Sequence, residues 1–238
     1  MDFRRIRRKL RAGLDLFTGN SRYTYAQFAE DILIDTLFTG LNIKQPSYLD
    51  IGANHPRGGS NTYFFYLKNS VGVCIEPDIN LYNKIKSARP KDVVLNAGVG
   101  LGDVKEATFY YFPEPYTGWN TFSKEDADLK KAQTGVAYKN DGVIPFININ
   151  EIIEQYFKPV PDFISIDVEG LDLDILRTLD FERFAPKVLC VETMQFVNGN
   201  ILGQKNMEIT AFLENKGYII YATTYVNSIF VKKELLKA

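Results

Sequence analysis

Short apolar runs alternate along the chain with longer segments in which apolar residues recur every three or four positions. Strands buried on both faces appear as continuous apolar runs, whereas helices that cover a sheet have the longer spacing. The pattern predicts strands at residues 48–51, 71–75, 93–96, 163–168, 188–192, 218–222 and 229–232. Between them it predicts helices at residues 79–88, 149–157, 171–179 and 207–215.

The order of these elements predicts an α/β fold with a mostly parallel sheet. Alternation of strands and helices places neighbouring strands parallel and puts helices on both faces. The last two runs, "YIIYATT" and "NSIFVKK", are separated by a turn too short for a crossover helix. We therefore expect an antiparallel hairpin there, so that a seven-stranded sheet ends in an antiparallel last strand.

Two regions stand outside this alternation. Residues 1–45 form an expected N-terminal helical extension, and residues 107–122 form an expected β-rich insertion in the main domain, residues 46–238. In "MDFRRIRRKLRAGLDLF" apolar residues recur at spacings of three and four among arginines and lysines, which predicts a basic amphipathic helix over residues 1–17. Its target stays open between packing on this domain or on a second copy in a homodimer and an anionic membrane surface, with nucleic acid least favoured. A second helix is expected at residues 25–38.

Composition restricts the class of protein. With 238 residues, 45% hydrophobic and 24% charged, the chain can bury one substantial core. The net charge of −1 gives no general attraction to nucleic acid. Cys74 and Cys190 both lie in apolar runs, where buried free thiols fit a reducing compartment. No run approaches the roughly 18 apolar residues of a membrane span. We expect a cytoplasmic protein, with the inner face of a membrane as the alternative.

Acidic residues follow the first two predicted strands. Asp50 lies at the end of the first strand, in "YLDIGAN", and Gly52 follows it; Glu76 and Pro77 end the second. Open α/β sheets bind ligands beyond the carboxyl ends of their strands, and a carboxylate there can accept hydrogen bonds from ribose hydroxyls. The two acids thus predict a nucleoside pocket, the alternative being solvated residues at strand ends.

The turn after the first strand discriminates between nucleoside cofactors. A dinucleotide fingerprint needs three glycines, but the loop offers Gly52, Asn54 and Arg57 at those places. An acid without a pyrophosphate cradle suits S-adenosylmethionine, whose methionine portion carries an ammonium group. The sequence therefore favours methyl transfer over a nicotinamide-dependent oxidoreductase and over a catalytically silent nucleoside-binding module.

Six blocks, "YLDIGAN", "SNTYFFY", "GVCIEPD", "LNAGVG", "DFISIDVEGLDLDIL" and "KVLCVET", resemble FkbM-type methyltransferases in the same order. The resemblance covers roughly residues 46–232 and implies the Rossmann-like fold of class I methyltransferases. It implies an S-adenosylmethionine-dependent O-methyltransferase whose acceptor is a hydroxyl of a saccharide, glycan or similar natural product. The implied cofactor contacts are Asp50, Gly52, Ala53, Asn54, Glu76, Pro77, Asn96, Ala97 and Asp167.

Candidate catalytic groups come from two places. His55, the single histidine, follows the first strand and is either a proton acceptor or a turn cap packed on Pro56. Asp167, Glu169 and Glu192 follow two further strands. These acids can hold Mg²⁺ or another divalent cation, for which Asp167 and Glu192 are the candidate ligands, or act directly in acid–base catalysis. A third reading gives Glu169 only a helix-capping role.

Candidate acceptor contacts lie in two aromatic segments. Tyr116 and Trp119, in "ATFYYFPEPYTGWNTF", offer ring faces suited to a sugar, although the segment can equally fill a core. Ser60 and Asn61, in "SNTYFFY", either line the pocket or cap the helix that follows.

Overall fold

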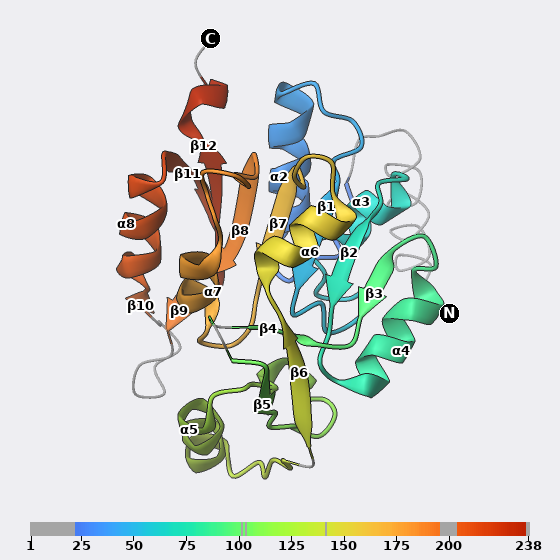
Figure 1. Cartoon of the computed structure of the whole chain (residues 1–238), viewed down its shortest axis with the longest axis vertical. Helices are drawn as coiled ribbons and strands as arrows, with labels where there is room; N and C mark the ends of the chain where they lie inside the picture. The colour runs from blue at the N-terminus through green and yellow to red at the C-terminus, as the bar shows by residue number, and fades with distance from the viewer. Residues whose placement is uncertain (1–21, 101, 103, 141, 196–203, 237–238) are drawn as a thin grey trace, which may run out of the picture.

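The computed structural model describes residues 22–100, 102, 104–140, 142–195 and 204–236. The predicted helix over residues 1–17 lies outside the described residues. Seven strands form the main sheet in the order β11-β12-β8-β7-β1-β2-β3 (Figure 1). Their bounds are β1 Tyr48–Ile51, β2 Gly72–Ile75, β3 Val93–Leu95, β7 Phe163–Ile166, β8 Val188–Glu192, β11 Tyr218–Thr223 and β12 Asn227–Lys232.

The sheet has the mixed pairing that the sequence predicts. Strands β3, β2, β1, β7 and β8 pair parallel, whereas β12 pairs antiparallel with both β8 and β11. The predicted seven-stranded sheet with an antiparallel last strand is confirmed. Every residue of β1, β2, β7 and β8 is buried, which explains why these strands read as unbroken apolar runs.

Helices cover both faces of this sheet, as predicted. On one face, α6 (Ile149–Tyr156), α7 (Asp172–Thr178) and α8 (Met207–Asn215) enclose a core that includes Ile153, Leu176 and Leu213. The other face is covered by α2 (Glu30–Gly40), α3 (Tyr63–Leu67) and α4 (Ile79–Ala88), which contribute Phe38, Phe65 and Ile85 to a second core. The carboxyl ends of the parallel strands all emerge at one edge, between these layers.

The helix expected from residue 25 begins at Glu30 instead. The buried carboxylate of Asp31 accepts hydrogen bonds from the hydroxyl of Thr24 and from the backbone N–H groups of Tyr25 and Ala26. These bonds hold the preceding residues in an irregular segment, because a side chain there replaces the carbonyl partners of a helix. Glu30, also buried, accepts from the Thr224 hydroxyl at 2.6 Å and joins this segment to the β11–β12 turn.

The β-rich insertion expected at residues 107–122 is part of a longer segment between β3 and α6 that also contains a helix. This segment contains β4 (Gly98–Val99), β5 (Glu106–Thr108), the 3₁₀ turn η1 (Thr117–Trp119), the helix α5 (Lys124–Thr134) and β6 (Val143–Ile147). A small sheet in the order β4-β6-β5 carries these elements, and we call residues 98–147 the insertion. Figure 1 shows its β5, β6 and α5 projecting beyond one end of the main sheet.

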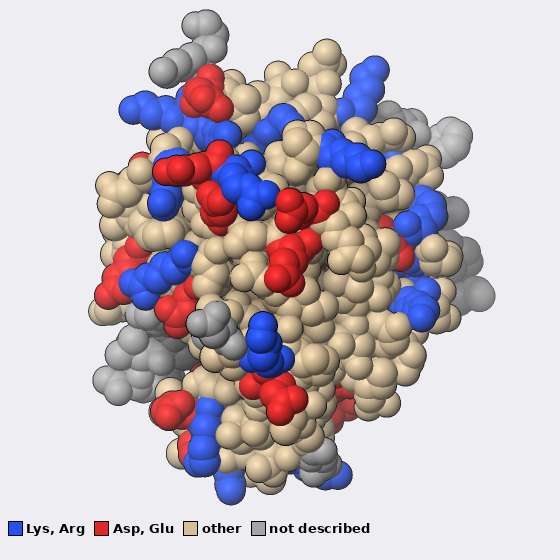
Figure 2. All heavy atoms as spheres, in the orientation of Figure 1, with Lys and Arg blue, Asp and Glu red and all other residues tan. Residues whose placement is uncertain are grey.

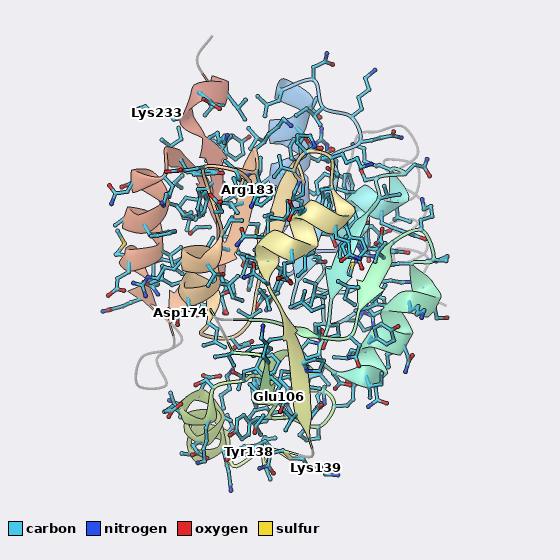
Figure 3. All side chains as sticks on the ribbon, in the orientation of Figure 1. Glu106, Tyr138, Lys139, Asp174, Arg183 and Lys233 are labelled. Atoms are coloured by element: carbon cyan, nitrogen blue, oxygen red, sulfur yellow. The ribbon has the colours of Figure 1, made fainter. Side chains whose placement is uncertain are left out.

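The apolar pattern gives no signal for α5. Its sequence, "KEDADLKKAQT", is polar around most of its circumference, and Ala127 is the one residue of the helix that is buried. Local chemistry fixes its ends instead: the Ser123 hydroxyl accepts from the Asp126 N–H at 3.2 Å, and Gly135, with φ 74°, terminates the helix. Glu106, Tyr138 and Lys139, labelled in Figure 3, lie with it at the projecting end.

The exposed surface has no single dominant charge on the face shown in Figure 2, where lysine and arginine alternate with aspartate and glutamate. Among the described residues, no helix is long and apolar enough to cross a membrane. The boundary predicted at residues 45 and 46 stays a prediction.

Candidate active site

A cavity of about 1070 Å³ opens at the carboxyl ends of β1, β2, β7 and β8 and extends to the insertion. Most of the residues singled out from the sequence line it. They are Asp50, Gly52, Ala53, Asn54, His55, Ser60, Asn61, Glu76, Pro77, Ala97, Trp119, Asp167, Glu169 and Glu192. Asn96 and Tyr116 are not among the lining residues.

Gly52 makes the turn after β1 possible. It has φ 81°, and a Cβ atom there would lie 1.9 Å from the carbonyl oxygen of Asp167. The N–H groups of Gly52 and Ala53 both donate to the carbonyl of Ile75, at 3.1 Å each. The chain therefore turns tightly against the neighbouring strand ends and presents bare backbone to the cavity.

Glu76 is the buried carboxylate at the end of β2. One of its oxygens accepts from the Asn54 N–H at 2.7 Å, and the other accepts from the Asp78 N–H at 2.8 Å. Burial raises the pKa of Glu76 to about 8. Each carboxylate oxygen has a second lone pair, so the group can still accept hydrogen bonds from a ligand's hydroxyls.

Asn96 supports this acid from behind. Its side-chain amide donates to the carbonyl oxygens of Glu76 and Pro77, at 2.9 and 2.8 Å. Both donor hydrogens are thereby occupied, so the structure gives Asn96 a role in fixing the β2 turn, and the expected cofactor contact stays a prediction.

Asp50 lies on β1 and lines the cavity, and its carboxylate contacts residues in the layer of α3 and α4. The Thr62 hydroxyl donates to its Oδ2 atom, and Arg89 Nη1 lies 3.9 Å from the same oxygen. Burial raises the pKa of Asp50, and the positive charge of Arg89 opposes that shift. Asp50 thus places a buried carboxylate close to the backbone turn.

Ser60 and Asn61 have structural partners as well as a place in the cavity wall. The Ser60 hydroxyl accepts from the Thr62 and Tyr63 N–H groups at 3.3 and 3.1 Å, which secures the start of α3. The Asn61 amide donates to the Ser165 hydroxyl at 3.1 Å. The capping alternative for Ser60 is therefore present in the structure, and substrate contact by both residues stays a prediction.

Asp167, Glu169 and Glu192 converge at the ends of β7 and β8. One carboxylate oxygen from each lies within 4.8 Å of the others, and we call these three residues the acidic cluster. Burial, followed by the charge of Glu169, raises the pKa values of Asp167 and Glu192 well above their ordinary values. Their carboxylates have no hydrogen-bond partner among the residues that the structure describes.

Glu169 has a different environment within this cluster. Its Oε2 atom lies 2.6 Å from Lys130 Nζ, which also lies 2.7 Å from Asp126 Oδ2. No side chain among the described residues caps the start of α7, so the expected capping by Glu169 is absent. Asp172, the first residue of α7, accepts instead from the Val168 and Gly170 N–H groups at 3.3 Å in the turn before the helix. Glu169, at φ 56°, is therefore held toward the insertion.

His55 acts as the cap of a turn. Its Nδ1 atom accepts from the N–H groups of Gly58 at 2.9 Å and Arg57 at 3.2 Å. In the neutral ring the proton is then on Nε2, so neither nitrogen of the exposed side chain can take a proton from a substrate. The prediction of a catalytic base at His55 is not supported by this geometry, and the capping alternative fits it.

The insertion supplies more of the cavity wall than Trp119, the residue that the sequence predicts there. Trp119 lines the cavity, and Tyr116 stacks on its outer side with ring centroids 4.5 Å apart. Further lining residues on the insertion include Thr117, Asn120, Thr121, Phe122, Asp126, Leu129, Lys130, Gln133 and Thr134. No local motif marks them in the sequence, because the fold of the insertion alone brings them to the cavity.

Contacts at the turns of β1 and β2 hold the insertion in place. The Thr117 hydroxyl donates to Asn54 Oδ1 at 3.3 Å, and the Asn120 amide donates to Asp78 Oδ2 at 3.4 Å. Except for Asn96 and Tyr116, the side chains expected to contact a cofactor and those expected to contact an acceptor therefore share one cavity.

The residues present fit S-adenosylmethionine. Glu76 offers a carboxylate for ribose hydroxyls, Asp50 offers one for an ammonium group, and Gly52 lines the cavity between them without a side chain. The strand order and the position of this site at the strand ends are those of the class I methyltransferase fold. The match to a methyltransferase family identifies the class of protein as an S-adenosylmethionine-dependent methyltransferase.

The sequence matches the Methyltransferase FkbM domain family over residues 50–220, and the chain belongs to that family. None of the curated proteins matches it. Solved structures with the same fold include a putative caffeoyl-CoA O-methyltransferase from Staphylococcus aureus, with 12% identity and a TM-score of 0.50. That alignment covers 93% of this chain and 98% of the other.

A second similar structure is the O-methyltransferase from Bacillus cereus in complex with SAH, with 12% identity and a TM-score of 0.43. It covers 92% of this chain and 86% of the other. At this level of identity the Staphylococcus aureus structure supports the fold alone, and the family match supports the activity.

Proposed function

We propose that this methyltransferase acts on oxygen, transferring the methyl group to a hydroxyl of a saccharide, glycan or similar polyhydroxylated natural product. The observation that carries the proposal is the acidic cluster, which lies in the same cavity as Asp50 and Glu76. S-adenosylmethionine, when bound, supplies a methyl group on a positively charged sulfur atom. What the protein must add is alignment of the acceptor oxygen and removal of its proton.

Asp167 and Glu192 are the groups suited to take that proton. Lys130 neutralises Glu169 directly, whereas Asp167 and Glu192 have no hydrogen-bond partner among the described residues. Because burial raises their pKa values, their carboxylates hold a proton more firmly than exposed ones do. An acceptor hydroxyl beside them would pass its proton to a carboxylate oxygen of this pair.

The acidic cluster also supports a second role, as the ligands of Mg²⁺ or another divalent cation. Hard cations prefer carboxylate oxygens, and three such oxygens lie within 4.8 Å of one another. A cation held there would supply positive charge that favours ionisation of a nearby hydroxyl. The two roles predict different effects of a chelator on activity: a proton acceptor keeps its activity in the chelator, whereas a cation site loses it.

The insertion supports a polyhydroxylated acceptor. Trp119 presents an aromatic ring, and α5 presents Lys130, Gln133 and Thr134 to the same cavity. Aromatic faces bind the apolar side of sugar rings, while amide, hydroxyl and ammonium groups bind their hydroxyls. This combination suits a saccharide better than a wholly apolar acceptor.

A screen with methyl-labelled S-adenosylmethionine against saccharides and hydroxylated natural products tests this function. We expect label on oxygen with at least one saccharide class, and little label with the Asp167→Asn, Glu192→Gln double variant. Running each assay with EDTA and with added Mg²⁺ separates the two roles of the cluster. Labelling confined to nitrogen or carbon acceptors would refute O-methylation.

A further inference from the structure

Arg89 is a buried cation behind the cofactor end of the cavity. It directly follows α4, and its side chain is completely buried. A buried guanidinium is tolerated only when its charge is compensated and its N–H groups are bonded. Arg89 meets this requirement with Nε, which lies 2.7 Å from Asp92 Oδ2, and with rings of Tyr48 and Tyr66 whose centroids are each 5.5 Å away.

The rest of the guanidinium leads to Asp50. Arg89 Nη2 donates to the Thr62 hydroxyl at 2.9 Å, and that hydroxyl donates to Asp50 Oδ2. Arginine can only donate, so the direction of both hydrogen bonds is fixed, and the arrangement requires Asp50 to accept. Arg89 Nη1 also lies 3.9 Å from Asp50 Oδ2.

This arrangement leaves the second carboxylate oxygen of Asp50 available. Oδ2 is occupied by Thr62, while Oδ1 has no hydrogen-bond partner among the described residues, and Asp50 lines the cavity. A buried carboxylate with one bonded and one open oxygen suits a ligand's ammonium group, which donates strongly to an ionised acceptor.

We propose that Arg89 is a positioning residue for the cofactor: acting through Thr62, it holds the Asp50 carboxylate negatively charged and oriented toward the α-ammonium group of S-adenosylmethionine. This inference rests on the cofactor dependence stated above and adds a residue to that site. Arg89 itself lies behind Asp50, away from the reacting atoms.

The surroundings of Asp50 explain why such a cation is needed. Burial raises the pKa of Asp50, the charge of Asp92 raises it further, and Arg89 with Thr62 lowers it. The other titratable groups that interact electrostatically with Asp50 are Cys74, Glu76, Asp167 and Cys190. Each of these is neutral when protonated and negative when ionised, so none can replace the positive charge of Arg89.

Binding of two ligands tests this role without any acceptor. S-adenosylhomocysteine carries the amino-acid portion, whereas 5′-methylthioadenosine has the same nucleoside without it. Calorimetry compares both ligands in the wild type, Arg89→Gln, Arg89→Lys and Thr62→Val. Arg183→Gln is the control, because Arg183 forms an exposed ion pair with Glu154 at 3.0 Å and lies away from the insertion (Figure 3).

We expect Arg89→Gln to weaken S-adenosylhomocysteine about tenfold or more, the loss typical of a charged hydrogen bond, while methylthioadenosine stays within about threefold. Arg89→Lys should recover part of the loss, and Thr62→Val, which keeps the cation, should lose less than Arg89→Gln. The loss in Arg89→Gln should grow as the pH is lowered, because Asp50 then takes up a proton at a higher pH. The comparison with methylthioadenosine separates this effect from the titration of Glu76, because both ligands would contact Glu76.

Parallel weakening of both ligands, or no weakening of S-adenosylhomocysteine, would overturn the inference and leave Arg89 a role in the fold alone. If Arg89→Gln does not fold, Thr62→Val decides: an unchanged ratio of the two affinities contradicts the inference. A wild-type protein that binds neither ligand would remove the cofactor site itself, and this inference with it.

Discussion

Replacing Gly52 by alanine should disrupt the cavity at the point where β1 meets β7. The added Cβ would lie 1.9 Å from the Asp167 carbonyl oxygen and 3.0 Å from its carbonyl carbon, so backbone must move. The residue would also keep a φ of 81°, which disfavours any side chain. Left-handed backbone costs about 1–2 kcal/mol, and overpacking a rigid contact costs about 1–3 kcal/mol more.

We therefore expect Gly52→Ala to lower the free energy of unfolding by about 2–5 kcal/mol and to weaken S-adenosylhomocysteine at least about tenfold. Gly135→Ala is the matched control, because Gly135 has φ 74° but no atom within 4 Å of the added Cβ. It should lose only the backbone contribution, about 1–2 kcal/mol, and should bind the ligand normally. Urea denaturation and calorimetry measure both quantities. Equal stability of the two variants, with normal binding by Gly52→Ala, would refute the steric reasoning.

Three further predictions concern single sites. Because the pKa of Glu76 is raised from 4.5 to about 8, the free energy of unfolding of the ligand-free protein should fall as the pH rises between these values. Glu76→Gln should flatten this fall and should weaken the binding of S-adenosylhomocysteine. A pH profile that the substitution leaves unchanged would contradict the raised pKa of Glu76. His55→Asn keeps an acceptor for the N–H groups of Arg57 and Gly58, so it should retain stability and ligand binding. His55→Ala should lose about 1 kcal/mol of stability. Equal melting temperatures of the two variants would count against the capping role of His55. If the acidic cluster binds Mg²⁺, thermal denaturation should show stabilisation of the wild type by Mg²⁺ that Glu192→Gln abolishes, and no stabilisation at millimolar Mg²⁺ would leave the proton-acceptor role.

The strands could be predicted from the sequence where both of their faces are buried. β1, β2, β7 and β8 are buried along their whole length, so their apolar runs have one simple interpretation. The end of each strand then locates Asp50, Glu76, Asp167 and Glu192 at one edge, because parallel strands end together. This topology is why acids more than 100 positions apart in the sequence could be assigned to one cavity.

The sequence was less informative where the direction of a side chain depends on hydrogen bonds to the backbone. From the sequence His55 is a candidate base, but in the structure its Nδ1 atom accepts from two backbone N–H groups. Asn96 followed a strand end as expected, yet its amide is committed to the carbonyls of Glu76 and Pro77. A single sequence gives the residue type and its approximate place but does not give the direction of the side chain.

The insertion was the hardest part to predict. α5 has no apolar stripe, so its amphipathic signal is absent, and its cavity-facing Lys130 reaches Glu169 through tertiary contact alone. Arg89 likewise gave no signal: it lies in the polar sequence "SARPKD", yet its side chain is completely buried. Both residues compensate buried acids, a need that becomes visible only once the acids are located in space.

The most direct measurement is a crystal structure of the protein with S-adenosylhomocysteine. We expect density in the cavity at the ends of β1 and β2, with the ribose hydroxyls bonded to Glu76 and the amino group bonded to Asp50. An empty cavity at saturating ligand, or a ligand bound elsewhere with Glu76 and Asp50 untouched, would contradict this expectation.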